Sequence, residues 1–265
     1  METFLNTSLS KAQRDALERQ DARYLTLPLS QDLNAVQAHL RHTVRLLKDR
    51  QTSSPSARAV GHLNGLFDRS IPAAAEKHLA CRQGCAHCCR QPVVVYAPEI
   101  FFLAAYIRNR EGMAQKVLSA GALAEGRKTQ IADWFECPLL EDNSCSVYSA
   151  RPLSCHAFVS LDVNDCLSAF RYMQEPKIQS PQVYNDQRNA CRMILLAAMR
   201  ALRLPAHAYE LNGGVLAAVL SKDNAEKRWL RGEDVLGSFK TLPPSIPEQI
   251  EIEIARMAQA AAAFI

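Results

Sequence analysis

The sequence predicts a mostly α protein, in which a helical domain carries a Cys-rich irregular insert. Apolar residues recur at helical spacing on both sides of the insert. Residues 135–181 are rich in Cys, Pro, Ser, Asn and Asp, and eight of the nine cysteines fall between positions 81 and 166. We expect three segments in one compact domain: helical residues 1–80, a Cys-rich module at 81–166 and helical residues 167–265.

The N-terminal segment is expected to be helical after a polar stretch, residues 1–27, that forms an arm or a late-packing helix. Ser30 is a natural N-cap. The helix after it carries apolar residues at helical spacing: Leu33, Val36, Leu40, Val44 and Leu47. Residues 51–58 are expected to form a loop before a second helix. Ser70 is expected to cap a third helix that runs directly into Cys81.

The middle of the chain alternates short elements with breaks. Residues 93–96 (Val-Val-Val-Tyr) predict a short strand, although the sequence shows no partner for it. Pro98 and Glu99 are expected to open a helix through about Arg110. A second helical stretch follows over roughly 113–134, and its glycines weaken it.

The C-terminal segment is expected to be helical from Pro181 onward. Pro205 breaks the first helix, and another runs to about Leu220. Gly213-Gly214 within it indicates a bend or close packing. Ser245 and Glu248 form a capping box for the last helix.

Composition excludes several classes. Hydrophobic residues make up 48% of the chain, which indicates a globular protein. A net charge of +4, from 31 basic and 27 acidic residues, requires no nucleic-acid partner. The N-terminus lacks the apolar core of a signal peptide, and no apolar run reaches the length of a membrane span. We therefore expect a cytoplasmic protein that does not enter a membrane, in a reducing compartment where structural disulfides are not expected.

The cysteines form two groups with short internal spacings that suit a metal. The first group reads CRQGCAHCC and the second reads CPLLEDNSCSVYSARPLSC, with one more cysteine ten residues later. Short spacings let thiolates converge, and the distant group completes the coordination shell. The candidate metal ligands are Cys81, Cys85, Cys88, Cys89, Cys137, Cys145, Cys155 and Cys166. Cys191 lies among apolar helix residues and is expected in the core.

The metal itself is left open between an iron–sulfur cluster and zinc or iron ions. Seven or eight thiolates exceed the four that one tetrahedral zinc or one 4Fe–4S cluster needs, and we favour the 4Fe–4S cluster. The side chains of adjacent Cys88 and Cys89 diverge in most backbone conformations. One of them is therefore expected to ligate while the other serves a second site or stays a free thiol. His87 and His156 are possible ligands, although an ordinary polar role is favoured for each.

These motifs resemble the YkgJ-type CxxCxxCC family of zinc- or iron-chelating proteins. The matching residues are Cys81, Cys85, Cys88, Cys89, Cys137, Pro138, Leu139, Cys145, Tyr148, Arg151, Pro152 and Cys155. The resemblance covers about residues 81–166 and implies a metal-chelating module. A relative, the flagellin lysine methylase, carries a similar Cys domain that is thought to hold an iron–sulfur cluster. Arg151 and Tyr148 are expected to surround and orient the ligands. His156 departs from the family, which often has Arg there.

Two enzyme classes and one non-enzymatic class remain as alternatives. Cys81, Cys85 and Cys88 have the spacing of radical S-adenosylmethionine enzymes, but no strand–helix alternation follows. A protein lysine methyltransferase using S-adenosylmethionine rests on the methylase analogy, without a Gly-rich nucleotide loop. The non-enzymatic alternative is a metal carrier, a redox sensor or a maturation protein that docks a protein partner, and thiols beyond four would suit redox sensing. The sequence leaves open whether the chain is an enzyme, and its oligomeric state.

Overall fold

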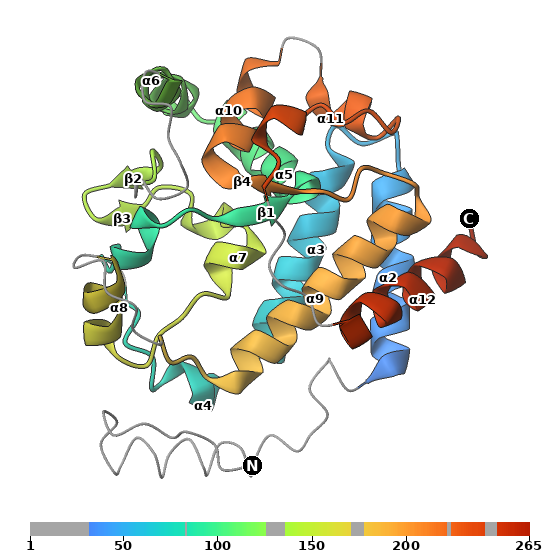
Figure 1. The fold of residues 1–265 in the computed structure, drawn as a ribbon, viewed down its shortest axis with the longest axis horizontal. Helices are drawn as coiled ribbons and strands as arrows, with labels where there is room; N and C mark the ends of the chain where they lie inside the picture. The colour runs from blue at the N-terminus through green and yellow to red at the C-terminus, as the bar shows by residue number, and fades with distance from the viewer. Residues whose placement is uncertain (1–31, 83, 126–135, 171–177, 222–223, 242–247) are drawn as a thin grey trace.

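The computed structural model describes residues 32–82, 84–125, 136–170, 178–221, 224–241 and 248–265, and these residues form a mostly α structure (Figure 1). The predicted fold class is therefore confirmed. The expected arm at residues 1–27, the Ser30 cap and the Ser245 capping box lie outside the described residues. Among the helices in these ranges, none has both the length and the apolar character needed to cross a membrane.

Four helices pack around the main core. They are α2 (Leu33–Lys48), α3 (Pro55–Ser70), α9 (Gln182–Ala201) and α12 (Glu248–Ala262). Helix α9 lies between α3 and α12 and contacts both, as well as α2 (Figure 1). Its inward face includes Ile194, which is fully buried. Phe67 of α3 and Ile254 of α12 are also buried, and neither side chain is more than 1% exposed. Burial of this apolar stripe explains why a 3.6-residue pattern was visible in the sequence.

The starts of α2 and α3 show ordinary capping chemistry. The side chain of Asp32 accepts the N–H of Ala35 at 2.9 Å and caps α2. Ser54 caps α3, with Pro55 in its first turn, so the expected loop at 51–58 ends earlier than predicted. Ser70 was wrongly expected to cap the following helix. It is the last residue of α3, where its hydroxyl donates to the carbonyl of Leu66 at 2.8 Å.

A second layer of helices covers the other side of α3. It contains α5 (Ala97–Arg108), α6 (Met113–Glu125), α10 (Leu211–Leu220) and α11 (Ala225–Trp229). Helix α10 lies against α5, where Gly214 leaves space for the side chain of Ile100. A Cβ on Gly214 would overlap Ile100, and one on Gly213 would overlap Phe239 beside the short turn η3 (Gly237–Phe239). The prediction of close packing at this pair is therefore confirmed.

The predicted strand exists, and its partner comes from a distant part of the chain. Strand β1 (Val94–Tyr96) pairs antiparallel with β4 (Ala208–Glu210), with Val94 opposite Glu210. A second pair joins β2 (Leu140–Glu141) to β3 (Ser144–Cys145). Asp142 and Asn143 between them have positive φ, which Asp and Asn tolerate in tight hairpin turns. The turn holds Cys145 opposite Leu140.

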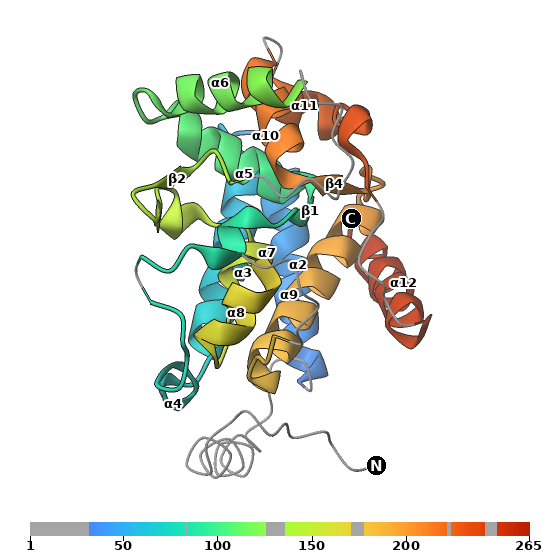
Figure 2. The same cartoon turned by 60° about the vertical axis from the view of Figure 1, so that its left-hand side comes forward.

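The Cys-rich region is built from short elements that the sequence did not resolve. They are α4 (Ala73–Glu76), η1 (His87–Arg90), η2 (Tyr148–Ala150), α7 (Leu153–His156) and α8 (Val163–Phe170). The expectation of a helix running into Cys81 is wrong, since α4 ends at Glu76. Residues 135–181 are not wholly irregular either, because α7 and α8 lie within them. Figure 2 shows α8 in front of α7 and beside the chain that leads to β1.

Candidate metal centre

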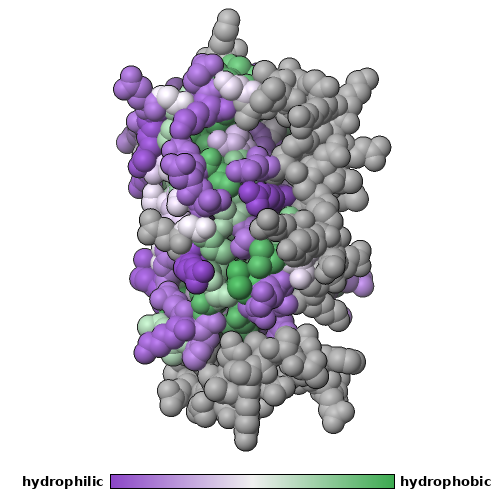
Figure 3. Space-filling model, turned by 90° about the vertical axis from the view of Figure 1, so that its left-hand side faces the viewer, coloured by the Kyte–Doolittle hydropathy of each residue, from purple (hydrophilic) through white to green (hydrophobic). Residues whose placement is uncertain are grey.

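A cavity of about 830 Å³ opens among the short elements of the Cys-rich region. It lies on the side of the molecule formed by β2, β3 and α8 in Figure 1, and Figure 3 shows apolar side chains gathered in a band between hydrophilic ones on that face. Six cysteines line the cavity: Cys85, Cys88, Cys89, Cys137, Cys145 and Cys155. The structure thus brings together the two cysteine groups that the sequence separates by about 50 residues.

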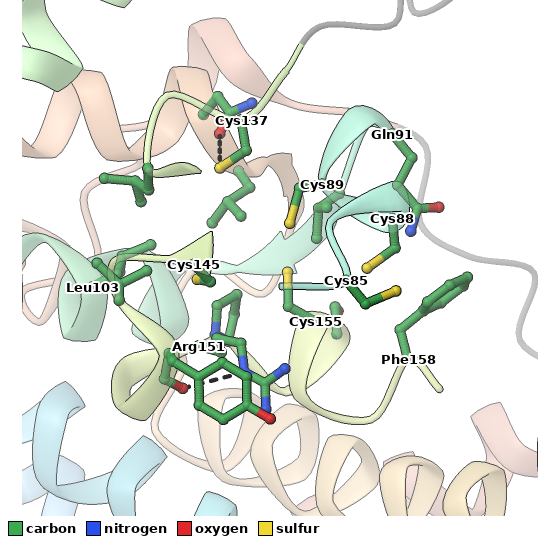
Figure 4. Close-up of a pocket in the computed structure, with 18 of the residues that line it drawn as sticks. Cys85, Cys88, Cys89, Gln91, Leu103, Cys137, Cys145, Arg151, Cys155 and Phe158 are labelled. Carbon is green, nitrogen blue, oxygen red and sulfur yellow. Dashed lines mark hydrogen bonds between the residues drawn. The ribbon is translucent and has the colours of Figure 1, made fainter. Parts of the chain in front are cut away.

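The two groups are joined by direct backbone contact. The N–H of Cys137 donates to the carbonyl of Cys89 at 2.8 Å, so the start of the second motif lies against the end of the first. Gly84 lies within the first group, between Cys81 and Cys85, and has a φ of 83°. Only glycine adopts this conformation without strain. In Figure 4 the side chains of Cys89, Cys137 and Cys155 face a common space.

Cys155 is held by a buried carboxylate. It lies on α7, whose first residue, Leu153, donates its N–H to Oε1 of Glu99 at 2.9 Å. Oε2 of the same side chain accepts the N–H of Tyr96 at 2.9 Å. Glu99 is only 3% exposed, so it links β1, α5 and α7 from inside the protein. The sequence reasoning assigned this glutamate only to the opening of a helix.

Cys81 and Cys166 lie apart from the cavity lining. The sulfur of Cys81 accepts the N–H of Ser160 at 3.3 Å. Cys166 is buried on α8 and forms a small apolar cluster with Ala169 and Phe170, against which Cys88 packs. The structure therefore places all eight predicted cysteines in one region, but in two different surroundings.

Burial makes most of these thiols hard to ionise. It raises the pKa of Cys137 to about 12 and that of Cys155 well above its ordinary value, and nearby thiols add to both shifts. Cys89 differs, because a hydrogen bond from the Cys88 thiol and then the positive charges of Arg151 and Arg90 lower its pKa. Since only thiolates ligate metals, a metal entering the cavity has to displace protons from buried sulfur.

Arginines supply the positive charge around the cavity. Arg82, Arg151, Arg188 and Arg192 line it, and among the described lining residues there is no Asp, Glu or Lys. Nε of Arg188 is buried without a hydrogen-bond partner in the described structure. Arg192 donates to the Ser154 hydroxyl at 3.0 Å. A cationic lining with one buried, unpartnered N–H fits a group of negative charge, such as a metal ligated by several thiolates.

Arg151 and Tyr148, which the sequence predicted to surround the ligands, lie against each other at the cavity. The guanidinium of Arg151 lies 3.6 Å from the centroid of the Tyr148 ring, and its Nε donates to the Tyr148 carbonyl at 3.2 Å. Both residues line the cavity. The positive charge of Arg151 also lowers the pKa of the thiol of Cys145, against the larger effect of burial. The role of both residues beside the ligands stays a prediction.

Two further sequence expectations concern residues outside the thiol set. His156 turns away from the cavity, with Nε2 2.7 Å from Oδ1 of Asp68 and its ring against Phe67, which is the polar role that the sequence favoured. His87 lies half-buried on η1. Cys191 is fully buried, and its thiol contacts the Leu63 carbonyl at 3.7 Å, so the prediction of a core position is confirmed.

Asn212 and the α9 arginines are site residues that sequence reasoning missed. Asn212 accepts from the Cys137 thiol at 3.9 Å, and the carboxylate of Glu210 fixes its backbone by accepting its N–H at 3.0 Å. Arg188 and Arg192 sit one helical turn apart on α9, so they share a face. That four-residue spacing was the only available signal for them.

The thiols surround the cavity without yet meeting at one point. In the described part of the chain, no group of three or more His, Cys, Asp or Glu side chains is arranged so that it could hold a metal ion as it stands. Ligation therefore requires the thiol side chains to rotate inward. The donor set itself fits a thiophilic metal, because the lining residues that the structure describes include six cysteines and no carboxylate.

Comparison with known families gives the same class. Residues 80–192 match the CxxCxxCC family model, described as "Putative zinc- or iron-chelating domain". The predicted resemblance is thus confirmed for this part of the chain, and the match supports chelation of zinc or iron. It extends beyond the expected end at Cys166 into α9, as far as Arg192. Comparisons with curated proteins and with solved structures find no match.

Proposed function

We propose that the chain binds an iron–sulfur cluster, of the 4Fe–4S type, in the arginine-lined cavity. The observation that carries this proposal is the combination of size and lining: about 830 Å³ of space with, among the described residues, six cysteines and four arginines around it. A structural zinc ion is enclosed by its four ligands and needs no cavity, whereas a cluster with its bridging sulfides occupies one. The cluster would supply electron transfer or Lewis acidity when bound.

Four of the six thiols are the proposed ligands: Cys89, Cys137, Cys145 and Cys155. These four interact electrostatically with one another, since each of the last three is influenced by the charge of Cys89. Arg151 also faces Cys89 and Cys145, where its charge offsets that of the thiolates. The hydrogen bond that lowers the pKa of Cys89 makes it the first of the four to be ionised.

The structure favours neither enzyme alternative. Both sheets of the described residues are antiparallel pairs, so this part of the chain does not build the strand–helix alternation of a radical enzyme. Gly213 and Gly214 lie within α10 and pack against Phe239 and Ile100, so they do not form a nucleotide-binding loop. We therefore propose that these glycines have a packing role and that the chain binds a metal.

Anaerobic purification followed by iron, zinc and acid-labile sulfide analysis tests the proposal. We expect about four iron and four sulfide per chain, with a broad visible absorbance that dithionite bleaches. Cys145→Ser should lose both iron and sulfide. The matched control is Cys191→Ser, which alters a thiol in the core and should retain both. A colourless wild-type protein with zinc and no labile sulfide would refute the cluster.

A further inference from the structure

Five of the eight clustered cysteines pack against two different apolar clusters. Cys137, Cys145 and Cys155 pack against the main hydrophobic core of the protein. Cys88 instead packs against the small apolar cluster of Cys166, Ala169 and Phe170, together with Phe158. A division of this kind is not expected if all the thiols serve one centre.

The division falls between two adjacent residues. Cys88 and Cys89 lie on η1, a 3-10 helix, where neighbouring side chains project about 120° apart. In Figure 4 the sulfur of Cys89 is directed toward Cys155, and that of Cys88 toward Cys85 and Phe158. The Cys88 thiol still donates a hydrogen bond to Cys89 and interacts electrostatically with Cys155 as well as Cys81, so Cys88 lies at the boundary between the two groups.

Cys81, Cys85 and Cys166 lie on the Cys88 side of this boundary. The thiol of Cys166 is close enough to those of Cys81 and Cys85 for their charges to interact, and the same holds between Cys81 and Cys85. Helix α8, which carries Cys166, packs directly on η1. Three thiols at sequence spacings of four and three residues, completed by one distant thiol, make a four-thiolate set.

We infer that Cys81, Cys85, Cys88 and Cys166 form a second metal centre, at the edge of the cavity where Cys85 and Cys88 line it, that holds a single tetrahedral zinc ion. This inference rests on the proposed function of the cavity thiols as ligands of the first centre. Cys85 and Cys88 line the cavity, whereas Cys81 and Cys166 lie outside its lining, so this set is centred beside the cavity. Four thiolates complete the coordination shell of one zinc ion. The N–H of Ser160 that donates to the Cys81 sulfur is a contact that stabilises a zinc-bound thiolate. Two-cluster ferredoxins likewise send closely spaced cysteines to different centres.

The division predicts that substitutions fall into two classes by the metal they remove. The full chain would be reconstituted anaerobically with ferrous iron and sulfide in the presence of Zn²⁺, desalted, and assayed for iron, sulfide and zinc. Wild-type protein should hold about one zinc besides its iron and sulfide. Cys81→Ser and Cys166→Ser should lose the zinc and keep the iron and sulfide. Cys137→Ser and Cys145→Ser should do the reverse.

The outcomes separate this inference from the proposed function. Loss of the same metals in all four variants would overturn the second centre. Wild-type protein with about two zinc ions and no sulfide would refute the iron–sulfur proposal. Two centres would still be supported if each variant then retained about one of the two zinc ions. Cys81 is exposed, so Cys81→Ser tests the second centre without disturbing the packing around buried Cys166.

Discussion

Replacement of Glu99 by glutamine should destabilise the protein although it preserves the side chain's shape. The two carboxylate oxygens accept one backbone N–H each, from Tyr96 and from Leu153, both at 2.9 Å. Glutamine has a single acceptor oxygen, so one buried N–H would face an NH₂ group. An unsatisfied buried donor costs about 1–3 kcal/mol. Each kcal/mol corresponds to a fall in Tm of about 2–4 °C for a protein of this size.

Thermal and urea unfolding followed by circular dichroism would measure this cost. Glu253→Gln is the matched control: its carboxylate pairs with Arg256 three residues along α12, an arrangement that contributes about 0.2–0.5 kcal/mol. Because Leu153 begins the helix that carries Cys155, Glu99→Gln should also weaken metal retention during dialysis against a chelator. A Glu99→Gln protein as stable as the Glu253→Gln control would show that the buried carboxylate does not hold α7 in place.

Two further changes test the packing of the helices. Gly214→Ala should destabilise the fold by about 1–3 kcal/mol, because the new methyl group would overlap Ile100. The control is Gly61→Ala, which should stabilise α3 by about 0.5–1 kcal/mol because no atom lies within 4 Å of the new Cβ. Equal urea midpoints for the two variants would contradict this prediction. Burial, and then neighbouring positive charge, lowers the pKa of His62 from 6.5 to about 4, and its Nε2 lies 3.2 Å from Nδ1 of His39. The unfolded chain therefore binds this proton first, so wild-type stability should fall as pH drops from about 6.5 to 4, and the unfolding free energy of His62→Asn should depend less on pH in that window. Parallel pH profiles for the two proteins would refute the assignment.

The helices were predictable because burial imposes a period on the sequence. Residues 182–201 show their apolar face in the spacing of Ile194, Ala198 and their neighbours, and the helix begins directly after Pro181 as expected. The strand at 93–96 was visible from its β-branched residues. Its partner, Ala208–Glu210, was not, since three residues with one apolar aromatic carry no alternation that a pattern could reveal.

The cysteines of the site were readable from spacing, but the rest of the site was not. Arg188 and Arg192 lie on a helix whose other face is core, and in sequence they are indistinguishable from solvated charges. Asn212 reaches the site only because β4 returns the chain to β1. Such contacts are set by tertiary packing between segments more than 70 residues apart, for which local sequence has no signal.

The pairing of β1 with β4 indicates that the metal-binding stretch does not fold as an independent fragment. A fragment ending at residue 192, where the family match ends, would lack β4, the Glu210 cap and Asn212. It would expose the edge of β1 and the face of α5 that α10 now shields. Grafted or truncated versions should therefore keep the chain through Leu220, so that β4 and α10 still pack behind the elements that carry the thiols.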